Sequence, residues 1–168
     1  LLGAESSGKS SLAQALVAEI RAIDGAPPVV WVPETLRLWC EARGRTPLRH
    51  EQADILQLHH THMTEARQQA GQDAWLIADT TPLMTAVYSQ HYFSDTSLYT
   101  HAWHAQRNFE VTLLMGLDLP WQADGPWRDG PAAQQAVEKA DRADADQYAP
   151  DIMAMARQQL GQAQQAAS

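Results

Sequence analysis

The stretch Gly3-Ala4-Glu5-Ser6-Ser7-Gly8-Lys9-Ser10 fits the pattern G-x-x-x-x-G-K-[ST] and constrains the chain more than any other feature. Glycine readily takes positive φ angles, so the two glycines allow successive backbone N–H groups to be directed at one anion. Lys9 and Ser10 then begin a helix whose positive N-terminal end attracts the same anion. The pattern predicts a loop that binds the phosphates of ATP or GTP, with Lys9 on the outer phosphates and the Ser10 hydroxyl on Mg²⁺. The predicted nucleotide-binding residues are Gly3, Ala4, Glu5, Ser6, Ser7, Gly8, Lys9, Ser10 and Ser11.

The residues on either side of this loop fit the setting that the pattern requires. Leu12, Leu16, Ile20 and Ile23 repeat at helical spacing, and Gly25 follows as a stop signal. A strand should precede the loop, but only Leu1-Leu2 represents it. We therefore expect that residues before Leu1 are missing from this sequence.

Two acidic residues follow short apolar runs that read as buried parallel strands. Val29-Val30-Trp31-Val32 leads to Glu34, and Trp75-Leu76-Ile77-Ala78 leads to Asp79. Because ligands bind at the carboxyl ends of such strands, both acids are expected beside the phosphate loop. Asp79 is predicted to orient Mg²⁺ or its waters, and Glu34 to hold or deprotonate a substrate hydroxyl. The sequence leaves open which acid is the base. A third strand is predicted at Val111-Thr112-Leu113-Leu114-Met115.

Further candidates surround these acids. Arg37, one turn after Glu34, either faces the crevice or covers the surface, and Tyr88 either packs at the core edge or stacks on a base. A loop dense in turn formers, acids and tryptophans runs from Asp118 to Arg128, and we expect a lid at about 118–131. Arg128 would bring positive charge to the transferring phosphoryl group. The predicted catalytic residues are Lys9, Glu34, Asp79 and Arg128, and the predicted substrate-binding residues are Glu34, Arg37, Thr80, Tyr88 and Trp121.

A long helix is predicted from His50 to about Ala70. We expect its buried face to comprise Ala53, Leu56, His60 and Met63, and its exposed face Glu51, Gln52, Arg67 and Gln68. The neighbouring His59, His60 and His62 do not indicate a metal site, because no carboxylate or further histidine is placed to complete one.

Composition limits the partners and the compartment. The formal net charge of −8 disfavours nucleic acid and anionic membranes, so we expect a small-molecule partner held at a local site. No run of about 18 apolar residues is present to span a membrane. Cys40 is the only cysteine, which excludes an intrachain disulfide and favours a cytoplasmic location. The oligomeric state is left open. Strands alternating with helices predict one α/β domain over residues 1–168, a three-layer sandwich with a mainly parallel sheet between helices.

Four segments in this order resemble the nicotinamide riboside kinase domain of NadR-type proteins and the AAA-type P-loop ATPase domains grouped with them. They are the glycine-rich loop, Pro33-Glu34-x-x-Arg37, Asp79-Thr80-Thr81, and Asp118-x-Pro120-Trp121-x-x-Asp124-Gly125 with Arg128. The resemblance covers nearly all of residues 1–131. It implies transfer of the ATP γ-phosphate to the 5′-hydroxyl of a riboside, with Mg²⁺, in the supply of NAD.

The chain departs from the family pattern in three places. The family's Asp-Thr-Asp is Asp79-Thr80-Thr81 here, Met84 replaces an expected threonine, and no final strand is visible between Ala140 and Ser168. The missing third-position acid favours an alternative function, a regulatory ATPase or GTPase switch that binds and hydrolyses nucleotide without a riboside pocket.

Overall fold

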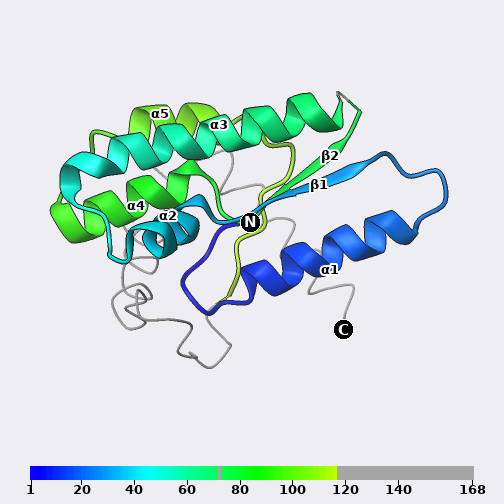
Figure 1. The fold of residues 1–168 in the computed structure, drawn as a ribbon, viewed down its shortest axis with the longest axis horizontal. Helices are drawn as coiled ribbons and strands as arrows, with labels where there is room; N and C mark the ends of the chain where they lie inside the picture. Colours follow the sequence, from blue (N-terminus) through cyan, green and yellow to red (C-terminus); the bar gives the residue numbers. More distant parts are fainter. Residues whose placement is uncertain (72, 117–168) are drawn as a thin grey trace.

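A computed structural model describes residues 1–71 and 73–116, in which helices alternate with two short strands (Figure 1). Helix α1 (Lys9–Ala22) follows the glycine-rich loop directly. Its buried positions, Lys9, Ala13, Val17 and Ile20, lie at helical spacing. Ile23, which the sequence placed in the apolar stripe, is 61% exposed, because the helix ends one residue earlier.

Strands β1 (Val29–Val32) and β2 (Trp75–Ala78) pair in parallel, as the apolar runs predicted. In their register Val29 lies opposite Trp75 and Val32 opposite Ala78, so both strands end at the same edge of the sheet. β-Branched residues make up most of β1 and suit a strand with helices packed on both faces.

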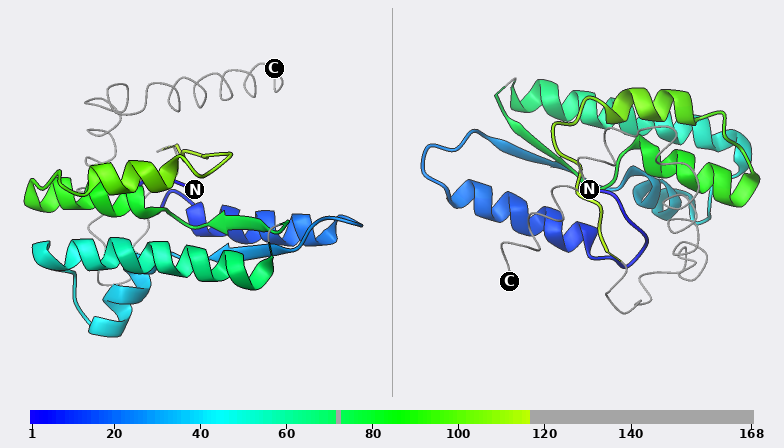
Figure 2. Two further views of the ribbon diagram at one scale, coloured as in Figure 1. Left: turned by 90° about the horizontal axis from the view of Figure 1, so that it is seen from above. Right: turned by 180° about the vertical axis from the view of Figure 1, so that it is seen from behind.

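The first two residues extend this sheet beyond β2. The Leu1 nitrogen donates to the Ala78 carbonyl at 2.8 Å, and Leu2 bonds on its other side to Leu113 and Met115 at 2.8 and 2.9 Å. Residues 1–2 are therefore hydrogen-bonded both to the end of β2 and to residues 113–115, while the sheet itself consists of β1 and β2, and Figure 2 shows the chain start beside these segments. The segment 111–115, predicted as a strand, forms one isolated parallel bridge in the structure, between Leu114 and Leu2.

Helices cover the strand pair from two sides (Figure 1). Helix α1 packs on one side of β1 and β2, and helix α3 (Gln52–Ala70) packs on the other. Helix α4 (Pro82–Phe93) contacts α3, and helix α5 (Tyr99–Gln106) contacts α4. This is the α/β arrangement, with a parallel sheet between helices, that the sequence predicted. None of the helices in the described part of the chain is long and apolar enough to cross a membrane.

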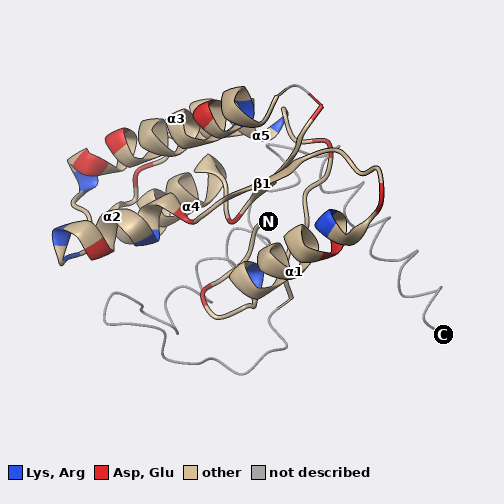
Figure 3. Ribbon diagram, turned by 45° about the vertical axis from the view of Figure 1, so that its right-hand side comes forward, with Lys and Arg blue, Asp and Glu red and all other residues tan. Residues whose placement is uncertain are grey.

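Among the described residues, the longest run of buried positions extends from Ala78 to Ser89 and includes the first two turns of α4. Neither α4 nor α5 contains a charged residue, and both are drawn without blue or red in Figure 3, whereas helix α2 (Thr35–Arg43) and α3 carry both signs. Side chains of α4 form a core with residues of α3, α5 and the chain start: Leu2, Leu56, Leu83, Met84, Ala86, Tyr88 and Ala102. This core supports the strand tip that precedes α4.

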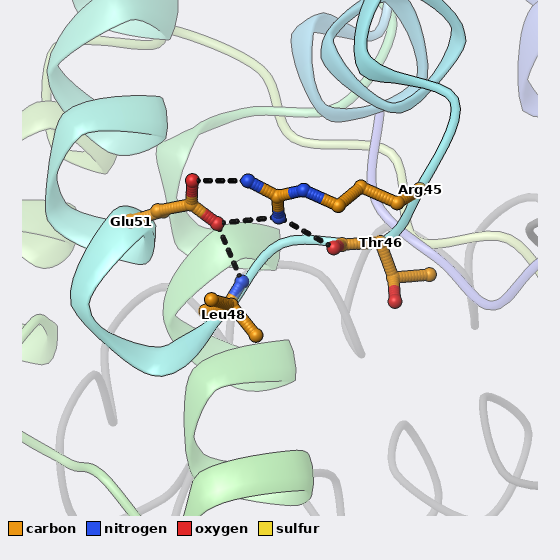
Figure 4. A network of polar contacts seen from close by, with 4 residues as sticks. All are labelled: Arg45, Thr46, Leu48 and Glu51. Carbon is orange, nitrogen blue, oxygen red and sulfur yellow. Dashed lines mark hydrogen bonds and ion pairs between the residues drawn. The ribbon is translucent and has the colours of Figure 1, made fainter.

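A hydrogen-bonded corner joins helix α2 (Thr35–Arg43) to α3 through the short 3-10 helix η1 (Arg49–Glu51). Arg45 donates two hydrogen bonds to the Glu51 carboxylate at 2.6 and 2.7 Å, and the Leu48 amide donates a third at 2.8 Å (Figure 4). The hydrogen bond from Arg45, followed by that from Leu48, lowers the pKa of Glu51 to about 2. The corner therefore stays ion-paired at any neutral or mildly acidic pH.

The buried face of α3 differs from the one that the sequence predicted. Gln52, Ile55, Leu56 and His59 are buried, whereas Ala53 and His60 are exposed. The predicted face is displaced by about one residue around the helix. The prediction continued the buried stripe from Leu56 to His60, whereas the buried stripe runs from Ile55 to His59. Arg67 and Gln68 are exposed as expected. This difference matters for the site, because His59, and not His60, faces the strands.

Candidate functional site

The glycine-rich loop has the backbone that an anion-binding turn requires. Gly3 has φ 145°, Ser6 has φ 58° and Gly8 has φ 82°, so three of six consecutive residues have positive φ. Gly8 is the N-cap of α1, and its carbonyl accepts from Leu12 at 2.9 Å. The positive end of α1 therefore lies directly at the loop.

Gly3 is also required by space. A Cβ on Gly3 would lie 2.9 Å from the Met115 Cβ and 3.0 Å from the Ser7 Oγ. The loop thus begins at a close approach between Gly3 and Met115. This explains the first glycine of the pattern by packing as well as by its φ angle.

Lys9 lies across the loop and is 5% exposed. Its Nζ donates to the Ala4 carbonyl at 2.5 Å, and the Ser7 Oγ donates to the same carbonyl at 2.8 Å. A buried ammonium group needs charged or polar partners, and phosphate oxygens within the loop would supply them. Ser10 is half-buried and Ser11 exposed in the first turn of α1.

The two predicted acids lie at the tips of the paired strands. Glu34 is the N-cap of α2, two residues after β1, and is 8% exposed. Asp79 directly follows β2, is 1% exposed, and its amide donates to the Val32 carbonyl at 2.8 Å. Since Val32 and Ala78 are register partners, both carboxylates belong to one edge of the sheet. Leu1, which leads into the loop, bonds to Ala78 beside Asp79.

The Asp79 carboxylate fits a divalent cation. Its Oδ1 is buried and has no hydrogen-bond partner among the described residues, and a buried charged oxygen without a partner is costly. Mg²⁺ bound with nucleotide phosphates needs only one or two protein ligands. No cluster of three or more metal-ligating side chains occurs in residues 1–71 and 73–116, and such a site does not require one. Ser10 and Asp79 are the residues that would hold the ion.

Two threonines that the sequence analysis did not select as site residues, Thr81 after Asp79 and Thr35 after Glu34, make side-chain hydrogen bonds at the strand tips. Thr81 caps α4, its Oγ1 accepting from the Leu83 amide at 3.3 Å and donating to the Gln106 Oε1 at 2.6 Å. Thr35, which follows Glu34, hydrogen-bonds through its Oγ1 to the His62 Nδ1 at 3.1 Å. Both links join residues more than 20 positions apart, so no local pattern shows them.

His59 on α3 is buried against the same turn. Its imidazole hydrogen-bonds to the backbone of Thr80, and burial, followed by the nearby His62, lowers its pKa to about 4. The imidazole is therefore neutral at physiological pH. One signal could have identified it, because His59 continues the stripe that Ile55 and Leu56 begin.

The other predicted site residues occupy different settings. Arg37 forms an ion pair with Glu41 at 3.3 Å along α2. Thr80 is buried in the turn after Asp79, and Tyr88 is buried in the core of α4 with its ring centroid 6.3 Å from that of Tyr92. Trp121, Arg128 and the lid expected at 118–131 lie outside the described residues.

A separate cleft of about 380 Å³ lies where η1 and the start of α3 meet the loop after α4. It is lined by Arg49, His50, Gln52, Ala53, Asp95, Ser97 and Leu98. None of these residues belongs to the glycine-rich loop or to the two strand tips. The phosphate site and this cleft are therefore different features of the surface.

The comparisons with known proteins agree with this geometry. Residues 1–149 match the family described as AAA domain, a family of P-loop NTPases that includes NadR-like kinase domains. No curated protein and no solved structure matches the chain. The family match covers most of the chain, including the glycine-rich loop, Glu34 and Asp79. The chain belongs to the AAA domain family of P-loop NTPases.

Proposed function

We propose that this P-loop domain is an ATP-dependent kinase that phosphorylates the 5′-hydroxyl of a riboside, with nicotinamide riboside as the first candidate. The observation that supports the proposal is the pair of buried carboxylates, Glu34 and Asp79, at the ends of the two paired strands. One acid beside bound phosphates can hold a cation, and a second acid can accept a hydrogen bond from the hydroxyl group of the phosphoryl acceptor.

Each residue of the site has a distinct task in such a reaction. The loop amides and Lys9 hold the phosphates of ATP, and burial of Lys9 strengthens that attraction. A bound Mg²⁺ would neutralise charge on the phosphates. Asp79 orients that ion or its waters, while Glu34 accepts a hydrogen bond from the acceptor hydroxyl and receives its proton. The buried positions of both acids limit water, which favours transfer to the hydroxyl over hydrolysis.

The proposal is tested by incubating the protein with ATP, Mg²⁺ and nicotinamide riboside and measuring both ADP and the riboside phosphate. Lys9→Ala is expected to abolish both products. Arg21→Ala, on the exposed side of α1, is the matched control and should retain wild-type rates. A panel of other ribosides and small alcohols identifies a different acceptor. ATP binding without phosphorylation of any acceptor would disprove the kinase function.

A second candidate, a nucleotide-dependent regulatory switch, is supported by Thr81. The resemblance implies an acid at this third position, and Thr81 instead caps α4 and bonds to Gln106. A switch would hydrolyse ATP or GTP slowly in the absence of any acceptor. Acceptor-independent phosphate release that requires Lys9 and does not rise with any riboside would favour it.

A further inference from the structure

The turn Asp79-Thr80-Thr81 holds an unfavourable backbone conformation. Thr80 has φ 66°, in the left-handed region, where a β-branched residue is a conformational outlier. Such a conformation is strained and persists only where the surroundings enforce it. The residue after the candidate metal ligand is therefore kept in place by its neighbours.

Gln106 holds this turn from the side of α5. It is 2% exposed, its Oε1 accepts from the Thr81 hydroxyl at 2.6 Å, and its Nε2 donates to the Thr112 hydroxyl at 2.8 Å. Thr112 precedes residues 113–115, which pair with Leu2 at the entry to the glycine-rich loop. Gln106 therefore connects the strand tip that carries Asp79 to the segment beside the loop.

His59 holds the turn from the side of α3. The imidazole is 1% exposed and hydrogen-bonds to the backbone of Thr80, the residue in the strained conformation. The amide of Asp79 donates a hydrogen bond to the Val32 carbonyl of β1. The three residues of the turn are therefore bonded to three different elements, β1, α3 and α5.

Stability alone does not account for an imidazole at this position. The His59 Nε2 is buried without a hydrogen-bond partner among the described residues, and an unpaired buried nitrogen is costly. An apolar side chain on the same face of α3, beside Ile55 and Leu56, would avoid that cost. A functional role for the conformation of Thr80 explains the imidazole, because the imidazole hydrogen-bonds to the Thr80 backbone.

We propose that His59 and Gln106 are positioning residues, which fix the turn after β2 so that the buried Asp79 carboxylate is aimed at the divalent cation. They act on the metal ligand indirectly, His59 through the backbone of Thr80 and Gln106 through the hydroxyl of Thr81. The proposal rests on cation and nucleotide binding at the loop. It does not depend on the phosphoryl acceptor.

The test is the ratio of ATP affinities measured by calorimetry with Mg²⁺ and with a chelator. Changing an outer partner of a metal ligand typically weakens metal binding by about 10- to 100-fold. His59→Leu should reduce the Mg²⁺-dependent gain in ATP affinity by about this factor and leave the affinity without Mg²⁺ unchanged. His60→Leu, at the exposed neighbouring position of α3, is the matched control and should keep the wild-type ratio.

Rescue distinguishes positioning from bulk packing. His59→Asn and His59→Gln place an amide near one or the other ring nitrogen, and the amide that reaches Thr80 should restore the ratio. In an Asp79→Asn background, His59→Leu should cause no further loss of the Mg²⁺-dependent gain. Gln106→Leu removes the contact to the same turn from α5. If His59→Leu fails to fold, the ratio of ATP affinities is measured in Gln106→Leu instead.

Three results would overturn the proposal. One is a wild-type ratio in folded His59→Leu and Gln106→Leu variants. Another is an equal loss of affinity with and without Mg²⁺, accompanied by a lower melting temperature, which is the mark of a structural role only. The last is ATP binding by the wild-type protein that Mg²⁺ does not strengthen. Absence of riboside phosphorylation, by contrast, contradicts only the proposed kinase function, because this assay needs no acceptor.

Discussion

Replacing Gly3 with alanine is expected to be among the most destabilising single-methyl additions in the described part of the chain. The new Cβ meets the Met115 Cβ at 2.9 Å and the Ser7 Oγ at 3.0 Å, and φ is 145°. Strain at such a backbone position costs about 1–3 kcal/mol, and overpacking costs about 1–3 kcal/mol more. Gly3→Ala should therefore lower the free energy of unfolding by about 2–6 kcal/mol.

Gly44 provides a matched control that separates the two contributions. It is the C-cap of α2 with φ 63°, and an added Cβ would meet nothing within 4 Å. Gly44→Ala should therefore cost only the left-handed backbone penalty, about 1–2 kcal/mol. For a chain of this length each kcal/mol lowers the melting temperature by about 2–4 °C.

The assay is urea unfolding of the wild type and both variants, followed by tryptophan fluorescence and far-ultraviolet circular dichroism. A midpoint for Gly3→Ala no lower than that for Gly44→Ala would refute the close approach of the loop to residues 113–115. In a Met115→Gly background, which removes the nearest atom, Gly3→Ala should become less costly. An unchanged cost there would show that strain, and not contact, dominates.

Three further predictions concern the polar contacts around the strand tips and the α2–α3 corner. Thr35→Val should lower stability by about 1 kcal/mol in equilibrium unfolding, because it removes the hydrogen bond to His62, and should cost nothing more in a His62→Leu background. Because burial lowers the pKa of His59 from 6.5 to about 4, the folded state excludes a proton that the unfolded chain binds. Unfolding free energy should therefore fall as pH drops from about 6.5 to 4, by about 3 kcal/mol in full, and this part of the slope should be absent in His59→Leu. Glu51→Gln removes the charge that Arg45 pairs with, so limited proteolysis between α2 and α3 should be faster at neutral pH, where the carboxylate of pKa about 2 is ionised in the wild type.

The features that the sequence predicted correctly are those that local chemistry determines. The glycine spacing requires a tight turn before a helix, and the short apolar runs at 29–32 and 75–78 suit buried parallel strands. The position of Glu34 and Asp79 at one sheet edge then follows from the parallel pairing alone. The strand at 111–115 was predicted at full length because its composition is β-prone. In the structure it forms a single bridge to Leu2, a partner far away in the sequence that composition does not reveal.

The contacts around Thr80 were not predictable for a related reason. Gln106 and His59 are ordinary polar residues of helices, and only the packing of α3 and α5 against one turn gives them a role. A shift of one residue in the assumed face of α3 was enough to place His60 in the core and to leave His59 out of it. Thr80, at positive φ, is bonded through its backbone to His59 of α3, and no local pattern marks that contact. Residues that fix a turn in this way are the least visible in a sequence, since their role depends on tertiary contacts and not on spacing.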